Sequence, residues 1–175
     1  HTMEGLMMHC PLTVPTILDH GNRVFPHKEI ISILPDKTRH SYTYTDLYKR
    51  SKKLMHALIN KLGVKPGDLI GTYAWNHYQH MELYYGIPGC GAICHTVNIR
   101  LSQSQTEFII NNAEDRFIFI DATLAPLIEP IASLLPTVEA YIILNAPKGF
   151  TTELKPCIDY VELIADAPDD SEWVQ

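Results

Sequence analysis

Residues 67–121 read GDLIGTYAWNHYQHMELYYGIPGCGAICHTVNIRLSQSQTEFIINNAEDRFIFID, and this stretch decides the fold. Short β-branched and aromatic runs alternate in it with longer segments of helical spacing. Strands are expected at 69–74, 92–97 and 116–120, and helices at 77–87 and 102–112. Because a helix separates each strand from the next, the strands are expected to pair in parallel, with helices on both faces of the sheet. The predicted fold class is therefore α/β.

The residues before this stretch predict a β-hairpin between two helices. Segments 29–34 and 40–44 have the composition of strands, and the turn-forming Pro35-Asp36-Lys37 lies between them. A short helix is expected ahead of the hairpin, over 13–25. After the hairpin, Thr43-x-x-Asp46 resembles a capping box, and apolar residues recur at helical spacing as far as Gly63, which suits a helix terminator.

The residues after this stretch predict one more strand and a weakly structured end. Apolar residues between 124 and 135 form a helix face, which Pro130 should kink or restart because proline lacks a backbone donor. Strand 140–144 and a short helix at 160–165 follow. The acidic tail 166–175 is expected to be loosely held. Residues 3–165 are expected to form one domain, and His1-Thr2, ahead of Met3, looks like a cloning remnant.

Composition places the chain among ordinary globular proteins. It has 175 residues, of which 46% are hydrophobic and 19% charged, and no run of about 18 apolar residues that could span a bilayer. Without a recognisable secretory signal, a cytoplasmic location is expected. A net charge of -6 argues against a nucleic-acid partner, since phosphates need a basic surface. Three of the four cysteines lie in or beside apolar segments, so buried free thiols are expected.

Polar residues follow several of the predicted strands. In an open parallel sheet, ligands bind beyond the carboxyl ends of the strands. Those ends carry Trp75-Asn76, Asn98-Ile99-Arg100, Asp121 and Asn145. Their side chains could orient a substrate, but Asn and Asp also cap helices, and capping is the favoured interpretation for Asn76 and Asp121.

Three short motifs are interpreted as structural. Gly89-Cys90-Gly91 begins like a dinucleotide-binding loop but lies between a helix and a strand, the reverse of the required order. Cys94-His95 has no second ligand pair at zinc spacing, and neighbouring strand residues point to opposite faces. Pro147-Lys148-Gly149 is expected to be a surface turn, because residues 142–146 before it contain no Ser, Thr or Gly to surround a phosphate. His77 and His80 are expected to pack.

A series of weak motifs occurs in a characteristic order between about Ser41 and Asn145. They are Tyr42-Thr43-Tyr44-Thr45-Asp46-Leu47, Gly63-Val64-Lys65-Pro66-Gly67-Asp68, Trp75-Asn76, Glu82-x-Tyr84-Tyr85, Gly91-Ala92, His95-Thr96-Val97-Asn98-Ile99-Arg100-Leu101 and Ala113-Glu114-Asp115. In this order they resemble the amino-terminal part of the adenylate-forming acyl-CoA synthetases, the AMP-binding enzymes, and within them the medium- or long-chain fatty-acid–CoA ligases. The family often has proline where this chain has Ile99.

The resemblance implies a two-step reaction in the full-length parent. A fatty acid carboxylate attacks the α-phosphorus of ATP to give acyl-AMP and pyrophosphate, and the thiol of CoA then displaces AMP. ATP, Mg2+ and CoA are thereby implied. The family's phosphate loop, a Thr/Ser/Gly run ending in Gly-x-Pro-Lys-Gly, is not found in these 175 residues. The chain is therefore expected to be an inactive fragment of a ligase, with no cofactor of its own.

The resemblance also suggests site residues. Trp75, Tyr84 and Tyr85 are candidates for lining the acyl pocket, and Asn98 and Arg100 are candidates for interface or substrate-side contacts. By analogy with dimeric relatives, a homodimer is possible. Two other hypotheses stay open: a complete small α/β ligand-binding module resembling a receiver domain, and an oligomerisation module that binds no ligand.

Overall fold

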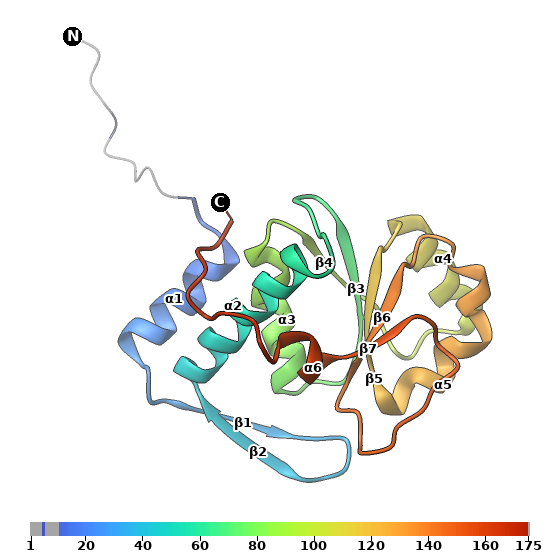
Figure 1. Ribbon diagram of the computed structural model, residues 1–175, viewed down its shortest axis with the longest axis horizontal. Helices are drawn as coiled ribbons and strands as arrows, with labels where there is room; N and C mark the ends of the chain where they lie inside the picture. The colour runs from blue at the N-terminus through green and yellow to red at the C-terminus, as the bar shows by residue number, and fades with distance from the viewer. Residues whose placement is uncertain (1–4, 6–10, 175) are drawn as a thin grey trace.

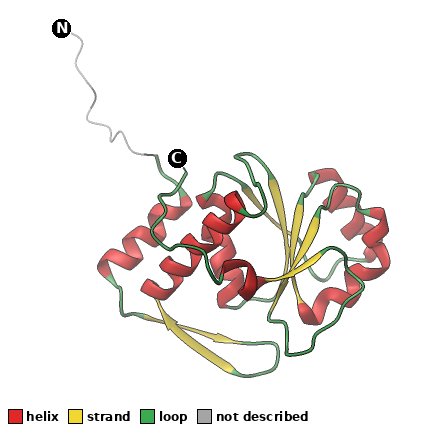
Figure 2. Ribbon diagram, in the orientation of Figure 1, coloured by secondary structure: helices red, strands yellow, loops and turns green. Residues whose placement is uncertain are grey.

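A parallel β-sheet lies between two layers of helices in the computed structural model, which describes residue 5 and residues 11–174 (Figures 1 and 2). The proposed cloning remnant, His1-Thr2, lies outside the described residues, as does Cys10. No helix in the described part of the chain is long and apolar enough to cross a membrane.

The sheet has five parallel strands in the order β4-β3-β5-β6-β7. They are β3 (Leu69–Tyr73), β4 (Ile93–Thr96), β5 (Phe117–Asp121), β6 (Ala140–Leu144) and β7 (Cys157–Asp159). The predicted α/β class and parallel pairing are confirmed. The sequence did not predict β7, because three residues are too few to show a periodicity. Of the described cysteines, Cys90 is buried, as expected for a free thiol, Cys94 is partly buried, and Cys157 in this edge strand is exposed.

Side chains alternate between the two faces of the sheet, and both faces are buried. In β5, Phe117 and Phe119 pack on one side, while Ile118 and Ile120 pack on the other. A strand covered on both faces can be apolar along its whole length. This explains why the run FIFI at 117–120 is continuous rather than alternating.

The two helical layers fill these faces. Helices α2 (Tyr44–Asn60), α3 (Tyr78–Gly89) and α6 (Tyr160–Ile164) cover the Phe119 face. The opposite face is covered by α4 (Gln103–Ala113), α5 (Ala125–Ile128) and the 3-10 turns η1 (Ala122–Leu124) and η2 (Glu129–Leu134). The predicted effect of Pro130 is confirmed, since the α-helix gives way to a 3-10 turn at Glu129.

The capping box predicted at Thr43 and Asp46 is present, and α4 begins with a second one. At the start of α2, Asp46 N–H donates to Thr43 Oγ1 (3.2 Å), and Thr43 N–H donates to Asp46 Oδ2 (2.9 Å). Ser102 and Gln105 make the same exchange at the start of α4. Each box satisfies backbone donors that the first turn of a helix leaves free.

Replacing Thr43 with alanine is expected to destabilise the protein by about 1 kcal/mol. The hydrogen bonds from Thr43 lower the pKa of Asp46, so this contribution is present above the ordinary aspartate pKa of roughly 3.9 and is lost as the pH falls through the lowered value. Urea unfolding at neutral and at acidic pH measures it. Thr151→Ala, at an exposed threonine outside any helix, is the control; an equal loss in both variants would contradict the prediction.

The hairpin reaches toward the carboxyl edge of the sheet. It is formed by β1 (Glu29–Ile33) and β2 (Arg39–Thr43), which pair antiparallel as predicted. It lies beside α1 (Val14–Val24) and α2 (Figure 1). A buried cluster that contains Leu18, Tyr42 and Leu47 joins these elements.

Two residues near the end of the acidic tail, Trp173 and Val174, form hydrogen bonds with the body of the protein, which the composition of the tail did not predict. Trp173 Nε1–H donates to Asp19 Oδ1 in α1 (2.9 Å), and Val174 N–H donates to the Gly89 carbonyl (2.8 Å). The indole lies so close to Gly89 that a Cβ there would come within 2.5 Å of it. One tryptophan can bury as much apolar surface as several smaller residues, so an otherwise polar segment can still be anchored.

A buried ion pair joins α2, α3 and α6. Glu82 in α3 is fully buried; its carboxylate accepts from Arg50 Nε (2.7 Å) and from the Tyr160 hydroxyl (2.6 Å). Burial raises the pKa of Glu82, and the neighbouring guanidinium opposes that shift. The three helices are therefore connected by a charged group that has no access to water.

Candidate functional site

The order of the strands changes direction between β3 and β5. Leaving β3, the chain passes through α3 to β4 on one side; it then returns through α4 to β5 on the other side of β3. In open parallel sheets, ligands bind in the crevice that such a reversal leaves beyond the carboxyl ends of the strands. Here that crevice lies between the loop 74–77 and residues 121–123.

A buried carboxylate organises this edge of the sheet. Asp121 is the last residue of β5, is fully buried, and accepts from the Trp75 backbone N–H (2.7 Å), from His77 Nε2 (3.0 Å) and from Asn145 Nδ2 (2.9 Å). Asn145 follows β6, and its own N–H donates to Gln79 Oε1 (2.9 Å). The ends of β3, β5 and β6 are thus connected through one side chain.

The capping interpretation of Asp121 and Asn76 is wrong. The side chain of Asp121 caps no helix, and the N-cap of α3 is His77, whose Nδ1 accepts from His80 N–H (3.3 Å). Because Nδ1 is an acceptor, the ring proton is on Nε2 and is donated to Asp121. His77 therefore links the helix start to the buried carboxylate.

The backbone of Trp75 is held on both sides. Its N–H donates to Asp121, and its carbonyl accepts from His80 Nδ1 (3.1 Å), while His80 Nε2 accepts from Thr72 Oγ1 (3.0 Å). Burial lowers the pKa of His80, which keeps the ring neutral as this pairing requires. The loop after β3 is fixed by two buried side chains.

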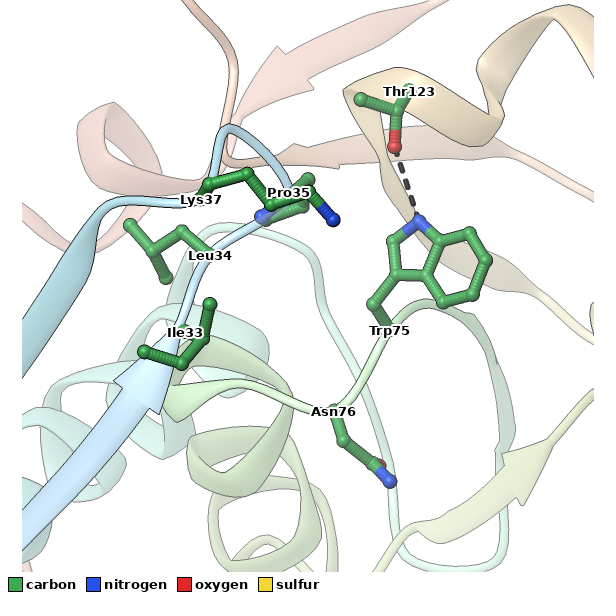
Figure 3. Close-up of a pocket in the computed structure, with 7 residues that line it drawn as sticks. All are labelled: Ile33, Leu34, Pro35, Lys37, Trp75, Asn76 and Thr123. Atoms are coloured by element: carbon green, nitrogen blue, oxygen red, sulfur yellow. Dashed lines mark hydrogen bonds between the residues drawn. The ribbon is translucent and has the colours of Figure 1, made fainter.

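The indole of Trp75 forms one wall of a pocket at the reversal point (Figure 3). Its Nε1–H donates to Thr123 Oγ1 (3.2 Å), yet the side chain stays 42% exposed. The hairpin turn forms the opposite wall. The pocket has a volume of about 510 Å³ and is lined by Ile33, Leu34, Pro35, Lys37, Trp75, Asn76 and Thr123.

A second pocket, of about 360 Å³, shares Trp75 and Asn76 with the first and contains four of the five residues singled out from the sequence. Trp75, Tyr84, Asn98 and Arg100 all line it. Tyr84 is exposed and stacks on His80, with ring centroids 4.9 Å apart. Asn98 also has a local role, because its Oδ1 accepts from Arg100 N–H (3.0 Å).

Tyr85 lies elsewhere. It packs with Leu18 and Leu47 in the cluster under α1, not beside Trp75 and Tyr84. Consecutive residues of a helix point about 100° apart, so Tyr84 and Tyr85 cannot share one narrow pocket face.

A metal or phosphate site needs several ligating groups in one place. Among the described residues there is no group of three or more His, Cys, Asp or Glu side chains able to hold a metal ion. The carboxylate of Asp121 is occupied by protein donors. Residues 147–150 form a turn closed by Phe150 N–H on the Pro147 carbonyl (3.0 Å), as predicted for Pro147-Lys148-Gly149.

Sequence reasoning missed Thr123 and the hairpin turn as parts of the site. Thr123 follows Asp121 by two residues, so its position after a strand was a usable signal. The hairpin turn offered none, because its place over the sheet edge is a long-range packing result.

Comparison with known proteins agrees with this architecture. The family model described as AMP-binding enzyme matches residues 18–170. The chain belongs to the AMP-binding enzyme family. Among curated members of the family, it is 37% identical over 98% of its length to the 3-methylmercaptopropionyl-CoA ligase of Ruegeria lacuscaerulensis, and it covers 32% of that protein. It is 38% identical over 86% of its length to the long-chain-fatty-acid–CoA ligase of Thermus thermophilus, of which it covers 28%.

Solved structures share the fold. A fatty acyl CoA synthetase of Mycobacterium tuberculosis superposes with a TM-score of 0.76 at 21% identity, over 93% of this chain and 30% of that one. The coronafacic acid ligase of Pectobacterium brasiliense gives a TM-score of 0.78 at 13% identity, over 93% and 31% respectively. The chain thus spans about a third of the length of the AMP-binding proteins that it matches.

Proposed function

We propose that this chain is the amino-terminal part of an ATP-dependent acid–CoA ligase that acts on fatty acids. Support comes from its AMP-binding family and from curated relatives that are named as acyl–CoA ligases, including one for medium-chain fatty acids from Ectopseudomonas oleovorans, 32% identical over 98% of this chain and 31% of that protein. The whole protein would join a fatty acid to CoA through an acyl-AMP intermediate, with ATP and Mg2+.

Within that enzyme, the chain would supply one side of the substrate site. The observation that carries this role is the fixed loop after β3: buried Asp121 and His80 hold the backbone of Trp75, while its indole stays exposed between two pockets. A rigid aromatic wall at this place can position an acyl chain without losing conformational entropy on binding. We assign Trp75 and Tyr84 to the acyl pocket, and Asn98 and Arg100 to substrate-side contacts.

Chemistry would depend on residues outside this chain. Because the sequence contains no phosphate loop of the family's type, and the described residues contain no group of three or more His, Cys, Asp or Glu side chains able to hold a metal ion, we propose that the 175-residue chain alone forms no acyl-AMP. A homodimer and a cytoplasmic location remain predictions for the whole protein.

The test compares this chain with a protein of the relatives' length that contains it. The longer protein is expected to release pyrophosphate with octanoate or palmitate and to form a thioester with CoA, whereas the 175-residue chain should do neither. Activity with an aromatic acid but not with fatty acids would contradict the substrate class. Pyrophosphate release by the 175-residue chain would contradict the proposal that this chain alone forms no acyl-AMP.

The receiver-like alternative loses its main support. That function needs an accessible acidic group at the strand ends, and Asp121 is fully buried with three protein donors. Light scattering would test the oligomerisation alternative, which predicts self-association of the chain.

A further inference from the structure

The pocket between the hairpin turn and Trp75 has the composition of a site for an amphiphile. Ile33, Leu34 and Pro35 give it an aliphatic wall, and the indole of Trp75 faces them across the gap (Figure 3). Its volume of about 510 Å³ falls inside the range of roughly 300–1,000 Å³ typical of small-molecule sites. Apolar walls of this kind favour an alkyl chain.

One cation borders this pocket. Lys37 lies in the hairpin turn, and Figure 3 shows its side chain extending toward the side on which Trp75 lies. The ion pairs formed among residues 11–174 do not include Lys37. The neighbouring Asp36 carboxylate instead accepts from Thr38 N–H (2.9 Å) and from the Thr38 hydroxyl (2.6 Å).

A second donor lies on the opposite wall. Thr123 Oγ1 accepts from Trp75 Nε1 (3.2 Å), so its own hydroxyl proton can be donated elsewhere. One ammonium and one hydroxyl suit a carboxylate, which needs few donors, better than a phosphate, which is usually held by several amides or cations.

We propose that this pocket binds a free alkyl carboxylate of medium length, with the chain between Leu34 and Trp75 and the carboxylate at Lys37. This is a second acid-binding site, adjoining the pocket that contains Tyr84 and Arg100, with which it shares Trp75 and Asn76. It needs no catalysis, so it can be tested on the 175-residue chain and stands independently of the ligase reaction.

Fluorescence of Trp75 reports binding directly. The chain has two tryptophans, and Trp173→Phe leaves Trp75 as the single indole. Titration with hexanoate, octanoate and decanoate monomers is expected to saturate, with affinity rising about three- to fourfold for each added methylene until the pocket is full. No saturable change with any of the three acids would overturn the proposal.

Charge is tested with ligands and variants of matched size. Octanoate should bind more tightly than octanol, and octylamine should bind most weakly. Lys37→Gln should weaken octanoate binding about two- to fivefold and leave octanol binding unchanged. Lys28→Gln, at another exposed lysine near the hairpin, is the control and should change neither. Equal binding of octanoate and octanol, or equal effects of the two lysine variants, would overturn the role of Lys37.

The apolar wall gives an independent check. Leu34→Gln should weaken the binding of octanoate and of octanol to the same extent, because the alkyl chain of each ligand would contact Leu34. Unchanged binding of both ligands would place the acid outside this pocket and overturn the proposal. Thioester formation by the longer protein would be unaffected by that result, so the two proposals can fail separately.

Discussion

Glu82→Ala is expected to destabilise the protein by about 3 kcal/mol. Removing one member of a buried ion pair usually costs roughly 3–5 kcal/mol, because the other charge is left buried without a counter-charge. Arg50 keeps 30% of its side chain exposed, so we expect the lower end of that range. The hydroxyl of Tyr160, which is fully buried, would lose its acceptor as well.

Urea unfolding followed by circular dichroism measures this loss. The matched control is Glu139→Ala, which removes a carboxylate paired with Arg116 at the surface, where 52% of the Glu139 side chain is exposed. An exposed pair contributes about 0–1 kcal/mol. Similar losses in the two variants would show that burial does not set the strength of the Arg50–Glu82 pair.

Asp121→Ala is expected to cost about 3 kcal/mol, because three donors lose one buried acceptor together. Each unsatisfied buried donor costs roughly 1–3 kcal/mol, and partial rearrangement of Asn145 should reduce the sum. The change should also release the Trp75 loop. In a Trp173→Phe background, the emission of Trp75 is therefore expected to shift toward that of a solvated indole.

Two comparisons make this prediction specific. Asp170→Ala removes an exposed carboxylate from the tail and should change stability by no more than about 0.5 kcal/mol. Asp121→Asn keeps one acceptor oxygen and should retain part of the stability. A destabilised Asp121→Ala protein with unchanged Trp75 emission would refute the link between the carboxylate and the loop.

The parts of the fold that could be predicted depend on local signals. Thr43 and Asp46 interact within one helical turn, so four consecutive residues are enough to predict the start of α2. The run at 117–120 is continuously apolar because both faces of β5 are covered, which is typical of a parallel sheet. Helices, central strands and turns of this kind can be predicted without knowing which distant residues they contact.

The remaining features depend on distant partners. Strand β7 exists because β6 offers it an edge, and the tail is ordered because Trp173 meets Gly89, a residue far away in the sequence. Capping is the common local role of an aspartate at the end of a strand, so the sequence favours that interpretation for Asp121. In the structure, the carboxylate instead accepts hydrogen bonds from Trp75 and Asn145, which are distant in the sequence. Tyr84 and Tyr85 are the same residue type at neighbouring positions. Only the way the cluster under α1 packs decides that Tyr85, and not Tyr84, is covered by it.

The anchoring of Trp173 also fixes where an added segment would emerge. Gly89 ends α3, just before β4 begins, so the tail is tied down at the amino-terminal edge of the sheet, opposite both pockets. Helix α1 lies beside the tail there (Figure 1). A fluorescent protein or a biotin tether joined after residue 174 would therefore be attached on the side of the molecule opposite the two pockets. On a sensor chip, such an attachment would leave the Trp75 surface facing the flowing solution.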